Sequence, residues 1–518
     1  MDTTVMSKEK QSKHYLAKII LTLVGVVLMW GLVVPAFEFP DEQAHLGTVS
    51  YLATEGHLPG YHVPDMTIEM TRVQELLGVL RNPQGQNSYT YHPEYHPDYT
   101  DSLVGKFESE IQSLNTVENR TTYTTVEEAA RYPVIYYAFS SVFWRIAGSG
   151  DLLTRLFAVR LGSLLIAALM AYVSYLTGML IFSKKKLALT LTTLVILQPM
   201  MSFVTAGINS DNLHNLLFML AIYLGLLVIK SGISAKLVLS LALTIGLDLY
   251  TKPQGFIMIP IVATALLISV LRHKKYRQLT WLALLAVLIT LLGWEQILKY
   301  QGFLNISNAD GASFVEYLRF SANKLLAQNV VWYWGVFKWL GVVLPPTYWR
   351  VANRVVLLSV LGLVVYVWRV IKRSKKIIDP YVVSYLLLTS LIYAAVIFWF
   401  DWQYVKGWGF SLGIQARYFF PTILAHMSIL LIGLRSLGWN KRSTLWITRL
   451  VFFLFLWLQL GGLWHLISIY YDTSSISTLI TQLSQYKPFY AKGNWWYLWS
   501  TIYLASISSL TCLIFKKK

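Results

Sequence analysis

The chain has 518 residues, of which 55% are hydrophobic and 14% are charged; soluble globular domains carry roughly 25% charged residues, so this composition excludes a water-soluble globular protein. The 44 Lys and Arg exceed the 26 Asp and Glu, but these cations cluster between apolar runs, where they orient membrane helices, so we expect no nucleic-acid partner. The single cysteine, Cys512, excludes a disulfide framework and a cysteine metal cage. Apolar runs of about 18 or more residues recur along the chain, and each can cross a hydrocarbon core of about 30 Å. We therefore predict a polytopic, all-α membrane protein surrounded by membrane lipids.

The first apolar run, residues 16–35, follows a basic N-terminal segment, residues 1–15, and so has the outline of a signal peptide. No small-residue cleavage site follows it, and we predict a retained first transmembrane helix. A large polar loop, residues 36–154, comes next. Within it, residues 133–147 are apolar but short for a span, so we expect a juxtamembrane or re-entrant helix there, with a thirteenth span as the alternative.

We predict about 12 transmembrane helices in all. Basic clusters fall between alternate spans, on the same side as the basic N-terminus, and the positive-inside rule makes that side cytoplasmic. We therefore expect a multi-pass protein of the cytoplasmic membrane, with both termini on the cytoplasmic side and the large first loop on the outer side. The predicted spans are residues 16–35, 155–182, 187–206, 211–230, 237–251, 255–271, 279–298, 354–371, 381–400, 416–435, 446–470 and 496–514. They divide the chain into the first helix, a bundle at 155–298, an outer loop at 299–353, C-terminal helices at 354–514 and a tail at 515–518.

The first candidate site lies at the outer end of the first span, where Asp41 and Glu42 follow Pro40. Acidic groups at a membrane boundary are costly unless they are solvated or paired. If a helix begins after Pro40, Asp41 and His45 share one face and could hold a metal or a substrate hydroxyl together. The alternative is that the two acids cap the helix and favour its N-terminal dipole.

Two outer turns supply the next candidates. Asn209 and Asp211 lie between two spans, where Asp211 could face the same cavity as Asp41 or merely begin a helix. Lys252 stands at the outer end of a span, against the positive-inside trend. A cation there suits a phosphate, although a lysine that extends to the interface explains it equally.

The last candidate segment contains Gln415, Arg417 and Tyr418 just before Pro421. An arginine so close to a long apolar run is costly to bury, and its fork geometry matches two phosphate oxygens. An ion pair with Asp401 or another outer acid is the alternative.

These motifs resemble the GT-C superfamily of polytopic membrane glycosyltransferases, and more closely a bacterial branch of predicted membrane proteins without assigned function. Phe39-Pro40-Asp41-Glu42 with His45 carries the resemblance first. Further matching segments are Arg131 with the following residues to Tyr137, residues 155–175, Gln198-Pro199 through Asn209-Ser210-Asp211, and Gln415-Ala416-Arg417-Tyr418, where Ala416 replaces the glycine of a Gln-Gly-Arg-Tyr signature.

The resemblance implies inverting transfer of a sugar from a polyprenyl-phosphate donor to a glycan, lipid or protein acceptor on the outer face of the membrane. Asp41 would then be the general base or a metal ligand, assisted by Glu42 and Asp211. Arg417 and Lys252 would hold the phosphate, and the other substrate contacts would come from His45, Asn209, Gln415 and Tyr418. Superfamily members differ in needing a divalent metal ion, so the resemblance leaves open whether Asp41, His45 and Asp211 bind one.

Two other functions remain open at the level of sequence. A glycan polymerase or ligase that uses the same lipid carrier would also need an outer arginine and a large loop. A transporter or flippase would show inverted repeats and ionisable residues near mid-span, whereas Asp248 and Glu295 lie close to the ends of the predicted spans.

Overall fold

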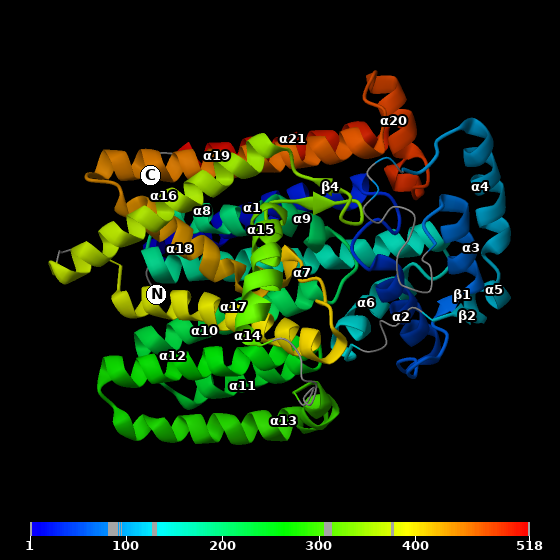
Figure 1. Cartoon of the computed structure of the whole chain (residues 1–518). Coiled ribbons are helices and arrows are strands. Elements are labelled where there is room, and N and C mark those ends of the chain that lie inside the picture. Colours follow the sequence, from blue (N-terminus) through cyan, green and yellow to red (C-terminus); the bar gives the residue numbers. More distant parts are fainter. Residues whose placement is uncertain are drawn as a thin grey trace.

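The computed structural model describes residues 3–80, 92, 94, 96–126, 132–304, 313–373 and 378–515, with side chains described from residue 14 onward except at 300–304. Arg131 and residues 516–518 of the predicted tail lie outside this part of the chain. Its regular structure is almost entirely helical (Figure 1). The expected all-α membrane architecture is therefore confirmed.

Ten helices in the described part of the chain are long and apolar enough to cross a membrane. An eleventh span results if α8 and α9, which meet at a bend of 66°, are counted as one broken span. The ten candidate spans are α1 (Thr3–Val33), α7 (Leu152–Phe182), α10 (Asp211–Ser231), α12 (Met258–His273) together with the 3-10 helix before it (Pro253–Ile257), α13 (Thr280–Leu304), α16 (Pro346–Ile371), α17 (Pro380–Trp408), α18 (Ile423–Ser436) together with the 3-10 helix before it (Ala416–Thr422), α19 (Lys441–Tyr470) and α21 (Trp495–Phe515); the broken pair is α8 (Lys185–Ile196) and α9 (Pro199–Ala206).

The span predicted at 237–251 corresponds to α11 (Ala235–Leu249), a helix of 15 residues. At 1.5 Å per residue it is about 22 Å long, shorter than a hydrocarbon core of about 30 Å. It packs against α10 and α13 within the bundle. The chain then turns through a short 3-10 helix, Pro253–Ile257, into α12.

The loops between the long helices contain most of the remaining structure. The first loop forms α2 (Glu42–Glu55), α3 (Ile68–Leu77), α4 (Asp101–Leu114), α5 (Val117–Thr121), α6 (Ile135–Ile146) and the antiparallel strands β1 (Met66–Thr67) and β2 (Tyr123–Thr125). The later loops form α14 (Phe314–Tyr317), the π-helix Leu318–Ala322, α15 (Asn323–Trp332), the hairpin of β3 (Val336–Phe337) and β4 (Val342–Val343), α20 (Ile476–Ser484) and the 3-10 helix Phe489–Ala491.

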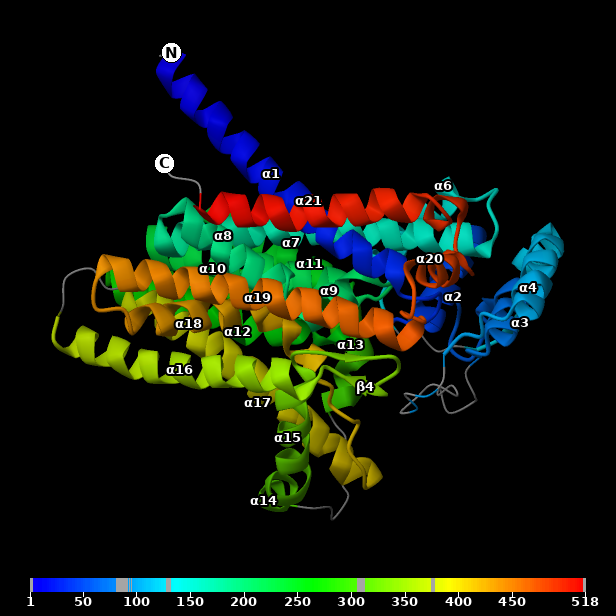
Figure 2. The same ribbon diagram turned by 90° about the horizontal axis from the view of Figure 1, so that it is seen from above.

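The first-loop helices and α20 gather at one end of the bundle, and both termini lie toward the other end (Figures 1 and 2). Helix α6 has 12 residues, about 18 Å at 1.5 Å per residue, which is too short to span. It packs on α2 and α7 instead, as expected of a juxtamembrane helix. A buried ion pair of 2.6 Å between Arg155 and Glu69 fastens the loop to α7.

Helix α16 is longer than the span predicted at 354–371. Helix α16 begins at Pro346, within the stretch predicted as outer loop. The proline occupies the first helical turn, where its missing N–H costs nothing. The helix starts among polar residues that hydropathy assigns to the loop, because a membrane helix can extend beyond the hydrocarbon core.

Candidate active site

Asp41 stands in the turn between α1 and α2 with a left-handed backbone, φ 57° and ψ 21°. Aspartate tolerates this conformation better than most residues because its short side chain can form local hydrogen bonds. Here the side chain makes no capping bond to α2. Instead, its Oδ2 accepts a hydrogen bond of 2.7 Å from Nη2 of Arg417. The capping interpretation of Asp41 is therefore wrong.

Arg417 lies in the 3-10 helix Ala416–Thr422, which leads into α18. Its side chain is 5% exposed, whereas that of Asp41 is 37% exposed. The guanidinium carbon lies 5.6 Å from the centroid of the Tyr418 ring. Nε and Nη1 of Arg417 are buried and have no hydrogen-bond partner among the described residues. The arginine therefore keeps two donors available beside the accessible carboxylate.

A second ion pair joins the start of α10 to the end of α11. Asp211 is the first residue of α10 and pairs with the Lys252 ammonium, and both side chains are buried. The backbone N–H of Lys252 donates to the Asp248 carbonyl at 2.8 Å, which fixes the lysine after α11. Its Nζ lies 5.5 Å from the centroid of the Tyr132 ring.

Asn209 connects the turn after α1 to the turn before α10. Its side-chain Nδ2 donates to the Pro40 carbonyl at 3.1 Å, next to Asp41. Its Oδ1 accepts from the backbone N–H of Asp211 at 2.8 Å. Asn209 thus aligns the two carboxylate-bearing segments and has a structural role that does not require substrate.

His45 lies between aromatic rings of the first loop. Its Nδ1 is 2.9 Å from the hydroxyl oxygen of Tyr137, and its ring stacks on Tyr132 and Tyr137. Burial lowers the pKa of His45 to about 4, although Asp41 and Asp211 raise it. The imidazole is therefore neutral at physiological pH and can exchange a hydrogen bond but adds no charge.

Glu42 points away from this cluster. Both of its carboxylate oxygens accept from Arg160 of α7, at 2.8 and 2.6 Å. Arg160 also donates to the carbonyls of Gly31, Val34 and Pro35. Glu42 is fully buried, so it braces the chain reversal that carries Asp41 and cannot assist it directly.

The remaining predicted contacts lie around Arg417. Gln415 is half-buried and immediately precedes its 3-10 helix, where its carbonyl accepts from the backbone N–H of Tyr418 at 2.9 Å. Asp401, the suggested partner of Arg417, instead accepts from Tyr317, Ser411 and Leu412. Arg417 therefore forms an ion pair, as the alternative predicted, and its partner is Asp41 and not Asp401.

Asp41, Asp211, Lys252 and Arg417 form one electrostatic cluster, because Arg417 pairs with Asp41, Lys252 pairs with Asp211, and Arg417 also lies within the electrostatic range of Asp211. Two carboxylates alternate with two cations, so their formal charges cancel. Four segments far apart in sequence meet here: the turn after α1, the start of α10, the end of α11 and the start of the Ala416–Thr422 helix.

The suggested metal ligands do not match a metal site in this arrangement. Asp41 is paired with Arg417, Asp211 with Lys252, and His45 with Tyr137. The described ranges contain no group of three His, Cys, Asp or Glu side chains that could hold an ion. We therefore derive no catalytic step through a metal.

Arg160 and a buried pair on α10 and α11 were missing from the sequence prediction. Nδ1 of His214 lies 2.9 Å from a carboxylate oxygen of Asp248, and both residues are buried. Arg160 could have been recognised from the sequence, because a cation inside an apolar run needs a buried partner. His214, a polar residue inside an apolar run one helical turn after Asp211, could have been recognised in a similar way.

Comparisons with known proteins place the chain among membrane proteins. The model of a family described as predicted membrane protein (DUF2142) matches residues 23–426. A search of curated proteins found no match.

Two solved structures are similar in outline. One is ArnT from Cupriavidus metallidurans bound to undecaprenyl phosphate, with 12% identity, coverage of 97% of this chain and 77% of that chain, and a TM-score of 0.42. The other is the archaeal oligosaccharyltransferase AglB from Archaeoglobus fulgidus in complex with an inhibitory peptide and a dolichol-phosphate, with 12% identity, coverage of 89% and 56%, and a TM-score of 0.42. Both belong to the GT-C glycosyltransferases.

Proposed function

The chain belongs to the DUF2142 family of predicted membrane proteins, and we propose that it is an inverting glycosyltransferase. It would take a sugar from a polyprenyl-phosphate donor and transfer it to a hydroxyl group of an envelope glycan, lipid or protein acceptor on the outer face of the cytoplasmic membrane. The proposal joins the sequence resemblance to the GT-C superfamily with the charge arrangement around Asp41.

The observation that carries the proposal is the state of Arg417. One of its nitrogens holds Asp41, while Nε and Nη1 are buried without a partner in the described part of the chain. A buried unsatisfied donor costs about 1–3 kcal/mol. A phosphate group would supply acceptor oxygens in the geometry that a guanidinium fork matches. Lys252, paired with Asp211, provides a second cation in the same cluster.

Asp41 is suited to act as the general base because it is the accessible carboxylate of the cluster. The acceptor hydroxyl would lose its proton to Asp41 as its oxygen forms a bond to the anomeric carbon of the sugar. The bond from that carbon to the phosphate oxygen breaks at the same time, and its electron pair leaves with the polyprenyl phosphate. Attack from the face opposite to the leaving group inverts the anomeric configuration.

Donor binding would also prepare Asp41 for this role. In the structure Arg417 holds the carboxylate, and a cation so close lowers its tendency to accept a proton. When the donor phosphate takes up the guanidinium, the carboxylate loses part of this stabilisation and becomes a better base. Arg417 would then stabilise the charge that grows on the departing phosphate.

The test compares lipid-linked and surface glycans in a deletion strain complemented with wild type, Arg417→Ala or Arg417→Lys. We expect the deletion to remove one sugar decoration and to accumulate its lipid-linked donor. Arg417→Ala should fail to restore the decoration, and Arg417→Lys should restore little of it, since an ammonium lacks the planar fork. Full restoration by Arg417→Ala at normal expression would refute the site. Loss of a whole glycan ladder would indicate a polymerase or ligase instead.

A further inference from the structure

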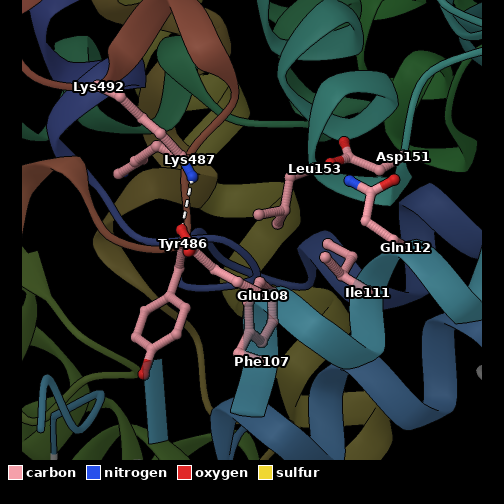
Figure 3. Close-up of a pocket in the computed structure, with 9 residues that line it drawn as sticks. All are labelled: Phe107, Glu108, Ile111, Gln112, Asp151, Leu153, Tyr486, Lys487 and Lys492. Atoms are coloured by element: carbon pink, nitrogen blue, oxygen red, sulfur yellow. Dashed lines mark hydrogen bonds and ion pairs between the residues drawn. The ribbon is translucent and has the colours of Figure 1, made fainter. Parts of the chain in front are cut away.

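A cavity of about 260 Å³ has lining residues that are all different from those of the Asp41 cluster. Three segments form it: α4 of the first loop, the start of α7, and the stretch that follows α20 (Figure 3). On this measure a single water needs roughly 10–15 Å³. The space can therefore hold a group far larger than a water molecule.

Both polar and apolar side chains line the cavity. Glu108 and Lys492 form an ion pair of 2.9 Å on one side, and their side chains are 52% and 40% exposed. Gln112 and Asp151 lie on the opposite side (Figure 3). Apolar surface comes from Phe107, Ile111, Leu153 and Tyr486.

The cations of the cavity are already engaged. Lys492 pairs with Glu108, and the buried Lys487 ammonium donates to the carbonyls of Leu32, Val33 and Val34. An anion such as phosphate would therefore find no unpaired cation among the lining residues and would meet the carboxylates of Glu108 and Asp151. The cavity disfavours anionic ligands.

Several hydrogen-bonding positions are still available. The Gln112 side-chain amide has no partner within the described ranges and offers both donors and an acceptor. Asp151 uses Oδ1 to accept from the N–H of Thr154 at 2.8 Å, which leaves Oδ2 for a ligand. Donors and acceptors next to apolar side chains match a neutral sugar ring, whose hydroxyl groups both donate and accept and whose C–H faces are apolar.

The cavity also connects to the segment that carries Asp41. The Val34 carbonyl accepts from both Lys487, at 2.9 Å, and Arg160, at 2.8 Å. Arg160 in turn holds Glu42, next to Asp41. A ligand in the cavity therefore lies against the same chain reversal that positions the proposed base.

We infer that this cavity binds a neutral sugar residue of the acceptor glycan, away from the hydroxyl that reacts. The inference rests on the proposed function, because it treats the bound sugar as part of an acceptor. It restricts that acceptor to glycan-bearing molecules. The site would act in recognition, so its loss should weaken acceptor binding and leave the chemical step intact.

The test measures saturation-transfer NMR of three methyl glycosides, those of glucose, N-acetylglucosamine and rhamnose, on the full chain in lipid nanodiscs without donor. Gln112→Trp fills the cavity from an exposed position of α4, and Ser113→Trp is the matched control, because Ser113 is exposed and does not line the cavity. We expect a signal from at least one glycoside that Gln112→Trp abolishes and Ser113→Trp keeps.

A third variant separates this inference from the proposed function. Arg417→Ala should keep the glycoside signal, even though it removes the proposed donor site, and excess inorganic phosphate should not compete. With an active enzyme, Gln112→Trp should raise KM for the acceptor and leave kcat unchanged. The inference is overturned if no glycoside gives a signal, if Gln112→Trp keeps the signal, or if Arg417→Ala removes it.

Discussion

Asp41 combines an uncommon backbone conformation with the proposed chemistry. Asparagine and aspartate both adopt the left-handed region readily, so Asp41→Asn preserves the turn while it removes the base. We expect kcat to fall about 10²–10⁴-fold, the usual contribution of a general base, with donor binding retained. Donor binding and turnover measured on the same preparation check this. Equal losses in both quantities would mean that Asp41 serves the phosphate site and not the proton transfer.

Glu38 provides a test of stability against pH. Burial raises the pKa of its carboxyl from the ordinary value of 4.5 to about 8, while the Tyr470 hydroxyl and Lys338 lower it. The folded protein therefore holds a proton that the unfolded chain has released between these two values, and stability should fall as pH rises from about 4.5 to about 8. Glu38→Gln should remove this dependence, since an amide oxygen can still accept from Tyr470. Thermal unfolding midpoints at pH 5 and pH 8 measure it, and an unchanged slope in the variant would contradict the assignment.

Residue chemistry could be predicted from the sequence where an unusual residue stood at a membrane boundary. Asp41, Asp211, Lys252 and Arg417 carried that signal, and the structure brings them together. Glu42 was predicted to assist Asp41 because the two residues are adjacent in the sequence, but in the structure its carboxylate pairs with Arg160. Its partner, Arg160, is 118 residues away, and the packing of α7 against α1 brings the two side chains together.

At the scale of elements, α10 and α11 are joined by two polar pairs, Asp211 with Lys252 and His214 with Asp248. The second pair lies one turn deeper along α10 and fixes the end of α11 from which Lys252 emerges. The two helices therefore position one proposed phosphate ligand through a connection buried inside the bundle.

A double-mutant cycle tests this connection. Removing one partner of a buried hydrogen bond typically costs about 1–3 kcal/mol, and more where the remaining group is charged, because that group is left unsatisfied. Asp248→Asn and His214→Gln should each lower the thermal unfolding midpoint strongly, and the double variant should lose much less than the sum of the two. Additive losses would show that the two side chains do not act as a pair.

Hydropathy predicted most of the helices well, because a run of about 18 or more apolar residues has few alternatives to a span. Hydropathy predicted the bounds of helices less well where the helices are short or broken. The bend of 66° between α8 and α9 occurs at Pro199, which cannot continue the hydrogen bonding of α8. The length of α11 depends on the turn at Lys252, which tertiary contacts determine.

For the whole molecule, the first-loop helices gather at the end away from both termini (Figure 2), and the charge-based topology predicts that this end faces outside. Cysteine labelling tests the orientation in a Cys512→Ser background. Ser113→Cys on α4 should react with a membrane-impermeant maleimide in intact cells, whereas Lys184→Cys, an exposed position between α7 and α8, should react only after permeabilisation. The reverse pattern would place the Asp41 cluster on the cytoplasmic side and refute the outer-face reaction.

The central claim is transfer from a lipid-linked sugar by Asp41 and Arg417. The most direct measurement reconstitutes the purified chain in nanodiscs, supplies polyprenyl-phosphate sugars and a glycan acceptor in the presence of a chelator, and determines the product and its anomeric configuration by NMR. We predict transfer of a single sugar with inversion, undiminished by the chelator and lost in both Asp41→Asn and Arg417→Ala. Undiminished transfer in these two variants, or retention of configuration, would contradict the account.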